Sequence, residues 1–302
     1  MPFQDMEACK RVRAIKKEDI SKHPNPDFKI QIIKNEDFGI RRILDMFMFI
    51  KEASDRDEQL VLILPNPHPE YKHVAYLINK FKINCRKLWT FNMDEYIDQD
   101  GKVAPDDWPQ GFNYCFLNSF YYQIEEKLRP PRHQSVAFTD KNIKDYGKMI
   151  EDLGGADICF GALGWTGHIA FIDPGAPEFA AETLEEFLNM GPREVTLNPI
   201  TIAQECLEPS GDWSSVPPRA VTIGPKEIMG AKLYQSWNGF HVAGTNISWE
   251  RFIVRLAAHG PVTRYVPASI LQIRRTDFFI KEVVAENVWA AKKVDARVLV
   301  KL

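Results

Sequence analysis

Short apolar runs alternate along the chain with segments in which apolar residues recur three or four positions apart. The runs have the length of strands buried on both faces of a parallel sheet, whereas the wider spacing is that of amphipathic helices. The predicted strands cover residues 28–33, 61–64, 87–91, 158–162, 220–223 and 235–243. The predicted helices cover residues 40–50, 70–81, 112–128, about 140–154 and 249–259.

Strands that alternate with helices form βαβ units with right-handed crossovers. The pattern therefore predicts an α/β protein with a mostly parallel sheet covered by helices on both faces, a three-layer α/β/α Rossmann-like fold. Sheets of this kind bind their ligands at the carboxyl ends of the strands, near the point where the strand order reverses. Functional side chains are therefore expected where these strands end.

Three parts of the chain differ in character. Residues 1–27 are polar and end in a turn-rich boundary, so we expect an N-terminal extension whose basic residues form a solvated arm. Residues 28–302 then form one α/β domain. Within it, residues 174–216 are rich in Pro, Glu and Asn and have weak periodicity. A long segment without regular structure is usually functional, and we expect a lid over the site.

Composition excludes several classes of protein. The net charge of −3 gives no sign of a nucleic-acid partner. The five cysteines are scattered without a paired motif, which favours reduced thiols over a disulfide framework or a zinc site. No apolar run reaches the ~18 residues of a membrane span, and the N-terminus has no secretory signal. We expect a cytoplasmic protein with no membrane partner.

The first chemical motif is Phe91-Asn92-Met93-Asp94-Glu95-Tyr96, at the exit of a predicted strand. Packing explains poorly why two adjacent carboxylates stand at that place. One interpretation is a helix cap beside a solvated acid, and the other is a ligand site. The position at a strand end favours the ligand site.

The second motif is the glycine-rich segment 161–174, which follows the next strand. Gly164 and Gly167 let the backbone turn tightly and approach a ligand. His168 is followed by apolar residues, where its charge would be costly unless paired. Asp173, five residues later, could fix its tautomer and tune its pKa. A satisfied structural histidine is the alternative.

Together the two motifs resemble the glucosamine-6-phosphate deaminase/isomerase family. The family's Phe-Asn-Met-Asp-Glu-Tyr signature stands unchanged at residues 91–96, and its Gly-His-Ile-Ala-Phe segment stands at 167–171. Further similarity at residues 216–224 and 266–272 extends the resemblance over about 28–280. The related 6-phosphogluconolactonases usually have an arginine at the place of Tyr96, which favours the deaminase branch.

The resemblance implies a chemistry that uses no metal or organic cofactor. His168, oriented by Asp173, would open the ring of a hexosamine phosphate. Asp94 would move a proton between C2 and C1 through an enolamine-like intermediate, and ammonia would leave to give a ketose phosphate. A single carboxylate can reach both carbons, and a closed lid would exclude water. We also expect Glu95, Gly164 and Gly167 to contact the substrate.

This chain departs from the family pattern beside the histidine. Thr166 stands where the family has an aspartate, and Asp173 stands where it has a glutamate. A threonine can hydrogen-bond to His168 but cannot be its anionic partner, and the aspartate is one methylene shorter. We keep Thr166 among the catalytic candidates because of its place in the motif.

The larger departure is in the loop that holds phosphate in the family. Its glycine-rich counterpart cradles phosphate with backbone N–H groups, whereas residues 65–69 here read Pro-Asn-Pro-His-Pro. Asn66 and His68 are candidates to replace some polar contacts. The family's lid arginine and a lysine fall near residues 206–207 and 247–250, where no cation is evident. The candidates to compensate are Arg219, Arg251 and Arg255, each of which has an alternative role in surface or salt-bridge contacts.

The sequence therefore predicts an amino-sugar deaminase/isomerase whose partner is a small-molecule sugar or sugar phosphate. Two alternatives stay open, a non-catalytic sugar-binding protein and a hydrolase of the 6-phosphogluconolactonase kind. Family members often assemble, which leaves a homo-oligomer open.

Overall fold

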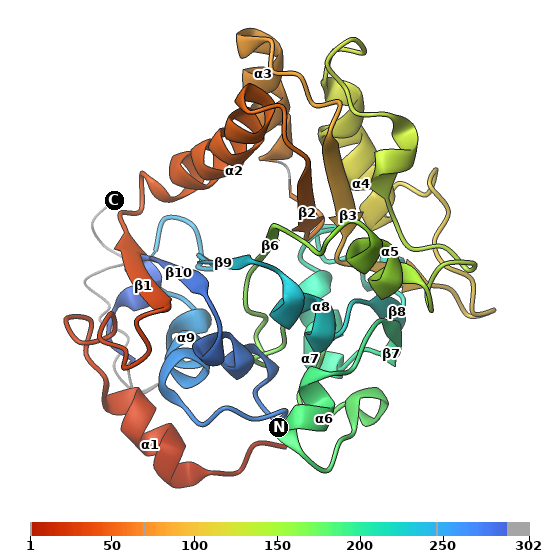
Figure 1. Ribbon diagram of the computed structural model, residues 1–302. Coiled ribbons are helices and arrows are strands. Elements are labelled where there is room, and N and C mark those ends of the chain that lie inside the picture. Colours follow the sequence, from red (N-terminus) through yellow and green to blue (C-terminus); the bar gives the residue numbers. More distant parts are fainter. Residues whose placement is uncertain (1, 69, 246, 289–302) are drawn as a thin grey trace.

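A seven-stranded sheet runs through the molecule, whose computed structural model describes residues 2–68, 70–245 and 247–288 (Figure 1). The strand order is β1-β10-β9-β6-β2-β3-β5, and every pair of neighbours is parallel. The strands are β1 (Phe28–Ile33), β2 (Leu60–Leu64), β3 (Leu88–Asn92), β5 (Ser135–Val136), β6 (Ile158–Gly161), β9 (Leu233–Asn238) and β10 (Thr276–Lys281).

The centre of the sheet is apolar on both faces, as the wholly apolar strand β2 shows. In β2 all five residues are buried. Since side chains alternate along a strand, Leu62 joins one hydrophobic cluster while Val61 and Ile63 join another on the opposite face. The three-layer α/β/α fold with a mostly parallel sheet is therefore confirmed.

Helices cover the two faces as βαβ crossovers require. The first cluster contains residues of α2 (Phe38–Asp55), α3 (Tyr71–Phe81) and α4 (Phe112–Ser119), which lie together on one side of the sheet (Figure 1). The second cluster contains residues of α5 (Tyr146–Asp152), α6 (Leu184–Leu188), α8 (Pro225–Gly230), α9 (Glu250–His259) and α10 (Glu282–Ala285).

A small antiparallel sheet stands beside the large one. Its order is β4-β8-β7, formed by β4 (Asp94–Ile97), β8 (Arg219–Thr222) and β7 (Arg193–Thr196). Only Met93 separates β3 from β4, so the chain leaves the parallel sheet and enters the small one within the first chemical motif. Pairing of Asp94 with Thr222 fixes the direction of that exit.

Several predicted elements end differently in the structure. The predicted helix 112–128 is correct only as far as Ser119, and a 3-10 turn, η1 (Tyr121–Gln123), follows. Ile124 and Leu128 are buried in turns, so their apolar character reflects burial rather than a helical face. The predicted strand 235–243 stops at Asn238. Strands β4, β5, β7 and β10 were not predicted: the first three lack an apolar run of strand length, and the run Phe278-Phe279-Ile280 in β10 has only three residues.

The N-terminal segment is packed, and the prediction of a solvated arm is wrong. Helix α1 (Met6–Ala14) packs against α9, with Val12 completely buried between them. The Arg255 side chain donates to the Ile15 carbonyl at 2.9 Å. The basic residues of this segment are on the solvent side of an amphipathic helix whose other side is apolar.

Residues 174–216 also contain more regular structure than predicted. They include two 3-10 turns, η3 (Pro177–Phe179) and η4 (Trp213–Ser215), as well as α6, β7 and α7 (Pro199–Glu205). The longest of these elements has seven residues, which is too short for hydrophobic periodicity to show in the sequence. The absence of a periodic pattern was therefore a poor guide to the absence of structure.

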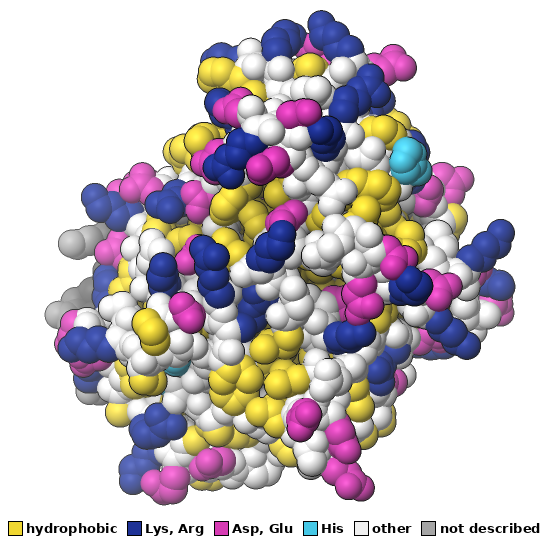
Figure 2. Space-filling view, in the orientation of Figure 1, with side chains coloured by type: hydrophobic (Ala, Val, Ile, Leu, Met, Phe, Trp, Pro, Cys, Tyr) yellow, Lys and Arg dark blue, Asp and Glu magenta, His cyan; other side chains and the backbone are white. Residues whose placement is uncertain are grey.

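Basic and acidic side chains lie among one another on the face seen in Figure 2, which agrees with the small net charge. Within the described part of the chain, no helix has the length and apolar character needed to cross a membrane.

The burial of Val12 makes the N-terminal packing testable. We expect Val12→Ala to lower the free energy of unfolding by about 2 kcal/mol, because two buried methyl groups are lost and a cavity remains. Urea denaturation measures the change. Lys10→Ala, on the exposed side of the same helix, is the control and should change stability by less than about 0.5 kcal/mol. Equal effects of the two substitutions would contradict the packing of α1.

Candidate functional site

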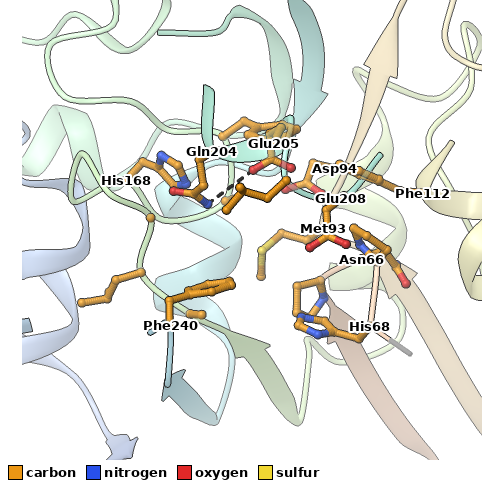
Figure 3. Close-up of a pocket in the computed structure, with 18 residues that line it drawn as sticks. Asn66, His68, Met93, Asp94, Phe112, His168, Gln204, Glu205, Glu208 and Phe240 are labelled. Atoms are coloured by element: carbon orange, nitrogen blue, oxygen red, sulfur yellow. Dashed lines mark hydrogen bonds between the residues drawn. The ribbon is translucent and has the colours of Figure 1, made fainter. Parts of the chain in front are cut away.

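The strand order reverses between β2 and β6. From β2 the chain proceeds through β3 to β5 at one edge, whereas from β6 it proceeds through β9 and β10 on the side that ends in β1. A cleft of about 780 Å³, partly open to solvent, lies at the carboxyl ends of these two strands. Its polar lining residues are Asn66, His68, Asp94, His168, Gln204, Glu205 and Glu208 (Figure 3).

Asp94 reaches the cleft from the start of β4 and is buried. Among the described residues, none makes a hydrogen bond or an ion pair with its carboxylate. Burial raises the pKa of Asp94 well above its usual value, and the charges of Glu205 and Glu95 act in the same direction. A carboxyl group of this kind can both accept and return a proton at ordinary pH.

His168 faces the cleft from the loop after β6, and three oxygen atoms surround its Nδ1. These are Thr166 Oγ1 at 3.0 Å, Thr201 Oγ1 at 3.0 Å and Asp173 Oδ1 at 3.3 Å. The predicted partner Asp173 is therefore in place. Burial would raise the pKa of Asp173, but hydrogen bonds and charge from His168, with further bonds from Thr201 and Asn198, keep it below its usual value.

The direction of these hydrogen bonds fixes the tautomer of His168. Thr166 and Thr201 each donate their single hydroxyl proton to Asp173 Oδ1, at 3.1 Å and 2.7 Å. Only oxygen lone pairs then remain to face Nδ1, so Nδ1 must carry a proton. The Nε2 atom is left as the acceptor, and it makes no hydrogen bond with any described residue. The histidine thus presents a base to the cleft.

The two predicted glycines of this loop position His168. A Cβ atom on Gly164 would lie 1.9 Å from His168 Nε2, so only glycine allows the ring to lie against the backbone there. Gly167 has a φ of +85°, the left-handed region that favours glycine. Gly164 lines the cleft and Gly167 does not. A substrate-binding role for either residue remains a prediction.

Glu95 and Arg219 lie outside the cleft lining. The Glu95 carboxylate accepts hydrogen bonds from the backbone N–H groups of Tyr96, Phe112 and Asn113, the last two at the start of α4. Burial raises the pKa of Glu95 to about 7 against these three bonds. Arg219 is paired with Glu194 at 2.7 Å on the surface. The structure thus gives both predicted residues structural contacts.

Helix α7 and the turn after it form one wall of the cleft and supply residues that sequence reasoning missed. Thr201 holds His168 and Asp173, and Gln204 accepts a hydrogen bond from the Trp165 N–H at 2.7 Å. Burial raises the pKa of Glu205 to about 7, opposed by the charge of His168 and reinforced by that of Glu208. The weak pattern of residues 174–216 was the only signal that pointed to this wall.

The loop after β2 forms the opposite wall, with Asn66 and His68 in the lining and Pro69 outside the described residues. Burial and the nearby Arg42 lower the pKa of His68 to about 4, so the imidazole is neutral at ordinary pH. Of the residues predicted to bind substrate, Asn66, His68 and Gly164 therefore reach the same cleft as Asp94 and His168.

The remaining arginine candidates lie elsewhere. Arg255 is completely buried and donates to the carbonyls of Ile15, Arg251 and Ala285. Arg251 donates to the Val283 carbonyl. Both side chains thus join α10 to α9. In the described part of the chain, no group of three or more His, Cys, Asp or Glu side chains is placed to hold a metal ion.

No protein-family model matches the chain, but curated proteins are similar to it in sequence. The chain is 31% identical over 190 residues to glucosamine-6-phosphate deaminase of Caenorhabditis elegans, a match that covers 61% of this chain and 65% of that protein. It is 32% identical over 192 residues to the protein of the same name from Fusobacterium nucleatum subsp. nucleatum, covering 61% and 64%. The chain thus spans slightly less than two thirds of these relatives.

Solved structures share the fold over more of the chain. A monomeric glucosamine-6-phosphate deaminase superposes with a TM-score of 0.70 at 20% identity, over 85% of this chain and 99% of that one. The 6-phosphogluconolactonase from Leishmania guyanensis superposes with a TM-score of 0.60 at 14% identity, over 87% and 99%. The chain thus shares its fold with these deaminase and lactonase structures. In sequence, the chain is similar to curated glucosamine-6-phosphate deaminases over a little less than two thirds of their length.

The contacts of Thr201 lead to a testable prediction. We expect Thr201→Val to lower the free energy of unfolding by about 1–3 kcal/mol, because Asp173 loses a buried hydrogen bond and His168 Nδ1 loses an acceptor. Chemical denaturation measures the loss, and Thr196→Val on the exposed side of β7 is the matched control. If Thr201→Val is as stable as the control, the Thr201 hydroxyl does not stabilise the site.

Proposed function

We propose that the chain is an amino-sugar deaminase/isomerase that converts a 2-amino aldose into a ketose and ammonia. The observation that carries this proposal is the placement of Asp94 and His168 in one cleft, each with its reactive atom free of other described partners. One group is a carboxyl with a raised pKa, and the other is an imidazole with a defined tautomer.

His168 would open the sugar ring. Its Nε2 accepts the proton of the anomeric hydroxyl and returns a proton to the ring oxygen as the bond between C1 and that oxygen breaks. The product is the open-chain amino aldose. The transient imidazolium is stabilised because the Nδ1–H group faces lone pairs of Thr166 Oγ1, Thr201 Oγ1 and Asp173 Oδ1.

Asp94 would then carry out the isomerisation. Its carboxylate removes the proton from C2 while O1 takes a proton from the 2-ammonium group, which gives an enolamine, and it then returns the C2 proton to C1, which leaves an imine at C2. Water adds to the resulting imine at C2, and ammonia leaves to give the ketose. Because no described residue binds the Asp94 carboxylate, it can serve both carbons without breaking another contact.

Residues 174–216 would act as the wall that limits water access, through α7 and the turn after it. Residues 28–302 would form the catalytic domain and residues 1–27 its extension. Across the two parts, residues 1, 69, 246 and 289–302 lie outside the described part of the chain. The partner would be a small sugar or a sugar phosphate, and the relatives are named for glucosamine 6-phosphate.

Replacement of the proposed base tests this function directly. We expect Asp94→Asn to reduce ammonia and ketose release from glucosamine and glucosamine 6-phosphate by about 100- to 10,000-fold, because an amide cannot accept the C2 proton. A coupled ammonia assay measures turnover, with the exposed Glu126→Gln as the control. Thermal shift with the same sugars shows whether ligands still bind. Absence of turnover by the unsubstituted protein, despite binding, would favour a non-catalytic binding protein instead.

The pH profile provides an independent test of the same residue. Activity should fall as pH falls through the pKa of Asp94, because the protonated form cannot abstract a proton, and that pKa lies above the usual carboxyl value. Glu205 contributes to the raised pKa of Asp94, so Glu205→Gln should move the acidic limb to lower pH. An acidic limb that stays in place or moves upward would contradict the coupling of the two carboxyl groups. Glu126→Gln should leave the profile unchanged.

A further inference from the structure

The proposed reaction moves protons in two kinds of step, and the second kind still lacks a catalytic group. Asp94 serves the carbon atoms C1 and C2. The addition of water to the imine and the departure of ammonia then move protons on oxygen and nitrogen atoms. A side chain that both accepts and donates a proton accelerates steps of this kind. It would have to line the same cleft as Asp94 and His168.

Glu205 lines this cleft from the last residue of α7. Its side chain is half-buried, so a bound ligand can reach it. The carboxyl groups of Glu205 and Asp94 lie near each other in Figure 3, and the charge of Glu205 contributes to the raised pKa of Asp94. Gln204 Nε2 donates a hydrogen bond to Glu205 Oε1 at 3.4 Å. The second carboxyl therefore faces the same space as the proposed base.

The place of Glu205 on α7 explains this position. Thr201 and Glu205 are four residues apart, so their side chains lie on the same face of the helix, one turn from each other. Thr201 Oγ1 lies 3.0 Å from His168 Nδ1, and Gln204 Oε1 accepts from the Trp165 N–H at 2.7 Å. These two contacts fix α7 against the loop that carries His168. Glu205 is thereby held beside the reacting groups.

The surroundings of Glu205 allow its carboxyl group to change protonation state near neutral pH. Burial raises the pKa of Glu205 to about 7, opposed first by the charge of His168. The charges of Glu208 and Asp173 act with burial, whereas a hydrogen bond with Tyr96 acts against it. A carboxyl group with such a pKa is present in both forms at ordinary pH, as an acid/base catalyst requires.

The other polar side chains of the cleft are less suited to this task. Burial lowers the pKa of His68 to about 4, so its imidazole is a weak base at neutral pH. Glu208 is exposed to solvent at the rim. Apart from His168, the remaining polar residues of the described lining are amides, which do not exchange a proton in this range. Glu205 is thus the enclosed carboxyl that the isomerisation leaves unused.

We propose that Glu205 is the acid/base catalyst of ammonia release, which takes a proton from the water that attacks C2 and passes it to the departing nitrogen. The inference rests on the proposed function and adds a second catalytic carboxyl to the same site. Asp94 serves the carbon atoms, and Glu205 serves the oxygen and nitrogen atoms.

The step balances without a further reactant. Once Asp94 has returned its proton to C1, C2 carries a protonated imine, whose positive charge favours the ionised form of Glu205. The water oxygen bonds to C2 while the Glu205 carboxylate takes one water proton, which gives a carbinolamine. Glu205 then protonates the nitrogen and the C2–N bond breaks. The electrons of the O–H bond form the carbonyl, Glu205 takes the hydroxyl proton and passes it to solvent, and ammonia leaves.

Deuterium exchange separates the roles of the two carboxyls. In D2O, reversal of the enolamine places deuterium at C2 of recovered glucosamine 6-phosphate, and mass spectrometry measures it. The cleft is partly open to solvent, so the proton on Asp94 can exchange. We expect Glu205→Gln to lower ammonia release by about 100-fold or more, while C2 exchange falls by less than about fivefold. Because this exchange does not require Glu205, it also reports the acidic limb of Asp94 in the variant.

Asp94→Asn should lose both exchange and ammonia release, and Glu126→Gln, an exposed acid outside the cleft, should lose neither. Glu205→Asp keeps a carboxyl group and should release ammonia faster than Glu205→Gln. Thermal unfolding checks that each variant is folded.

Unchanged ammonia release by Glu205→Gln, or equal losses of release and exchange, would overturn the inference. Slower release by Glu205→Asp than by Glu205→Gln would do so as well. Failure of the proposed function gives a different result, since the unsubstituted protein would then neither exchange the C2 proton nor release ammonia.

Discussion

The parallel pairing of β2 with β6 is the constraint on which the site depends. Leu62 and Ile63 pair with Ile158 and Cys159, and the chain continues from these two strands toward opposite edges of the sheet. The crossovers must diverge there, so the loops that follow β2 and β6 cannot close over each other. They leave the cleft, with Asn66 on one side and His168 on the other. Strand β3, next to β2, delivers Asp94 to the same edge.

Asp94 and Glu95 are neighbours in the first motif, but their side chains have different surroundings. Successive side chains of a strand point to opposite sides, so Asp94 faces the cleft while Glu95 faces the start of α4. Both carboxyls are buried and both have a raised pKa. Glu95 is held by three backbone N–H groups and is fixed, whereas Asp94 has no such partner among the described residues and is free to exchange a proton. Residue type and position alone do not separate the two carboxyls; only the family resemblance assigned the proton transfer to Asp94, and it gave Glu95 a substrate contact rather than these backbone bonds.

The sequence predictions were most accurate where the physical cause of a feature lies within a short stretch of sequence. The strand at 61–64 was predicted because burial on both faces leaves a continuous apolar run. The pairing of His168 with Asp173 was predicted because both residues stand in one loop. Thr201 could not be predicted, since it reaches His168 only through tertiary packing of α7. Strand β10 was missed for a related reason: its burial depends on neighbours far away in the sequence.

The departures from the family pattern have opposite consequences at the two ends of the cleft. Beside His168, the hydroxyls of Thr166 and Thr201 lie between the imidazole and the shorter Asp173, so an anionic partner still acts on Nδ1. At the other end, Pro65 and Pro67 have no N–H group, and Arg42 is paired with Glu70 at 3.8 Å. The changes beside His168 thus compensate one another, whereas the prolines of the loop after β2 leave fewer backbone donors. The surroundings of His168 therefore follow the family pattern more closely than the loop after β2 does.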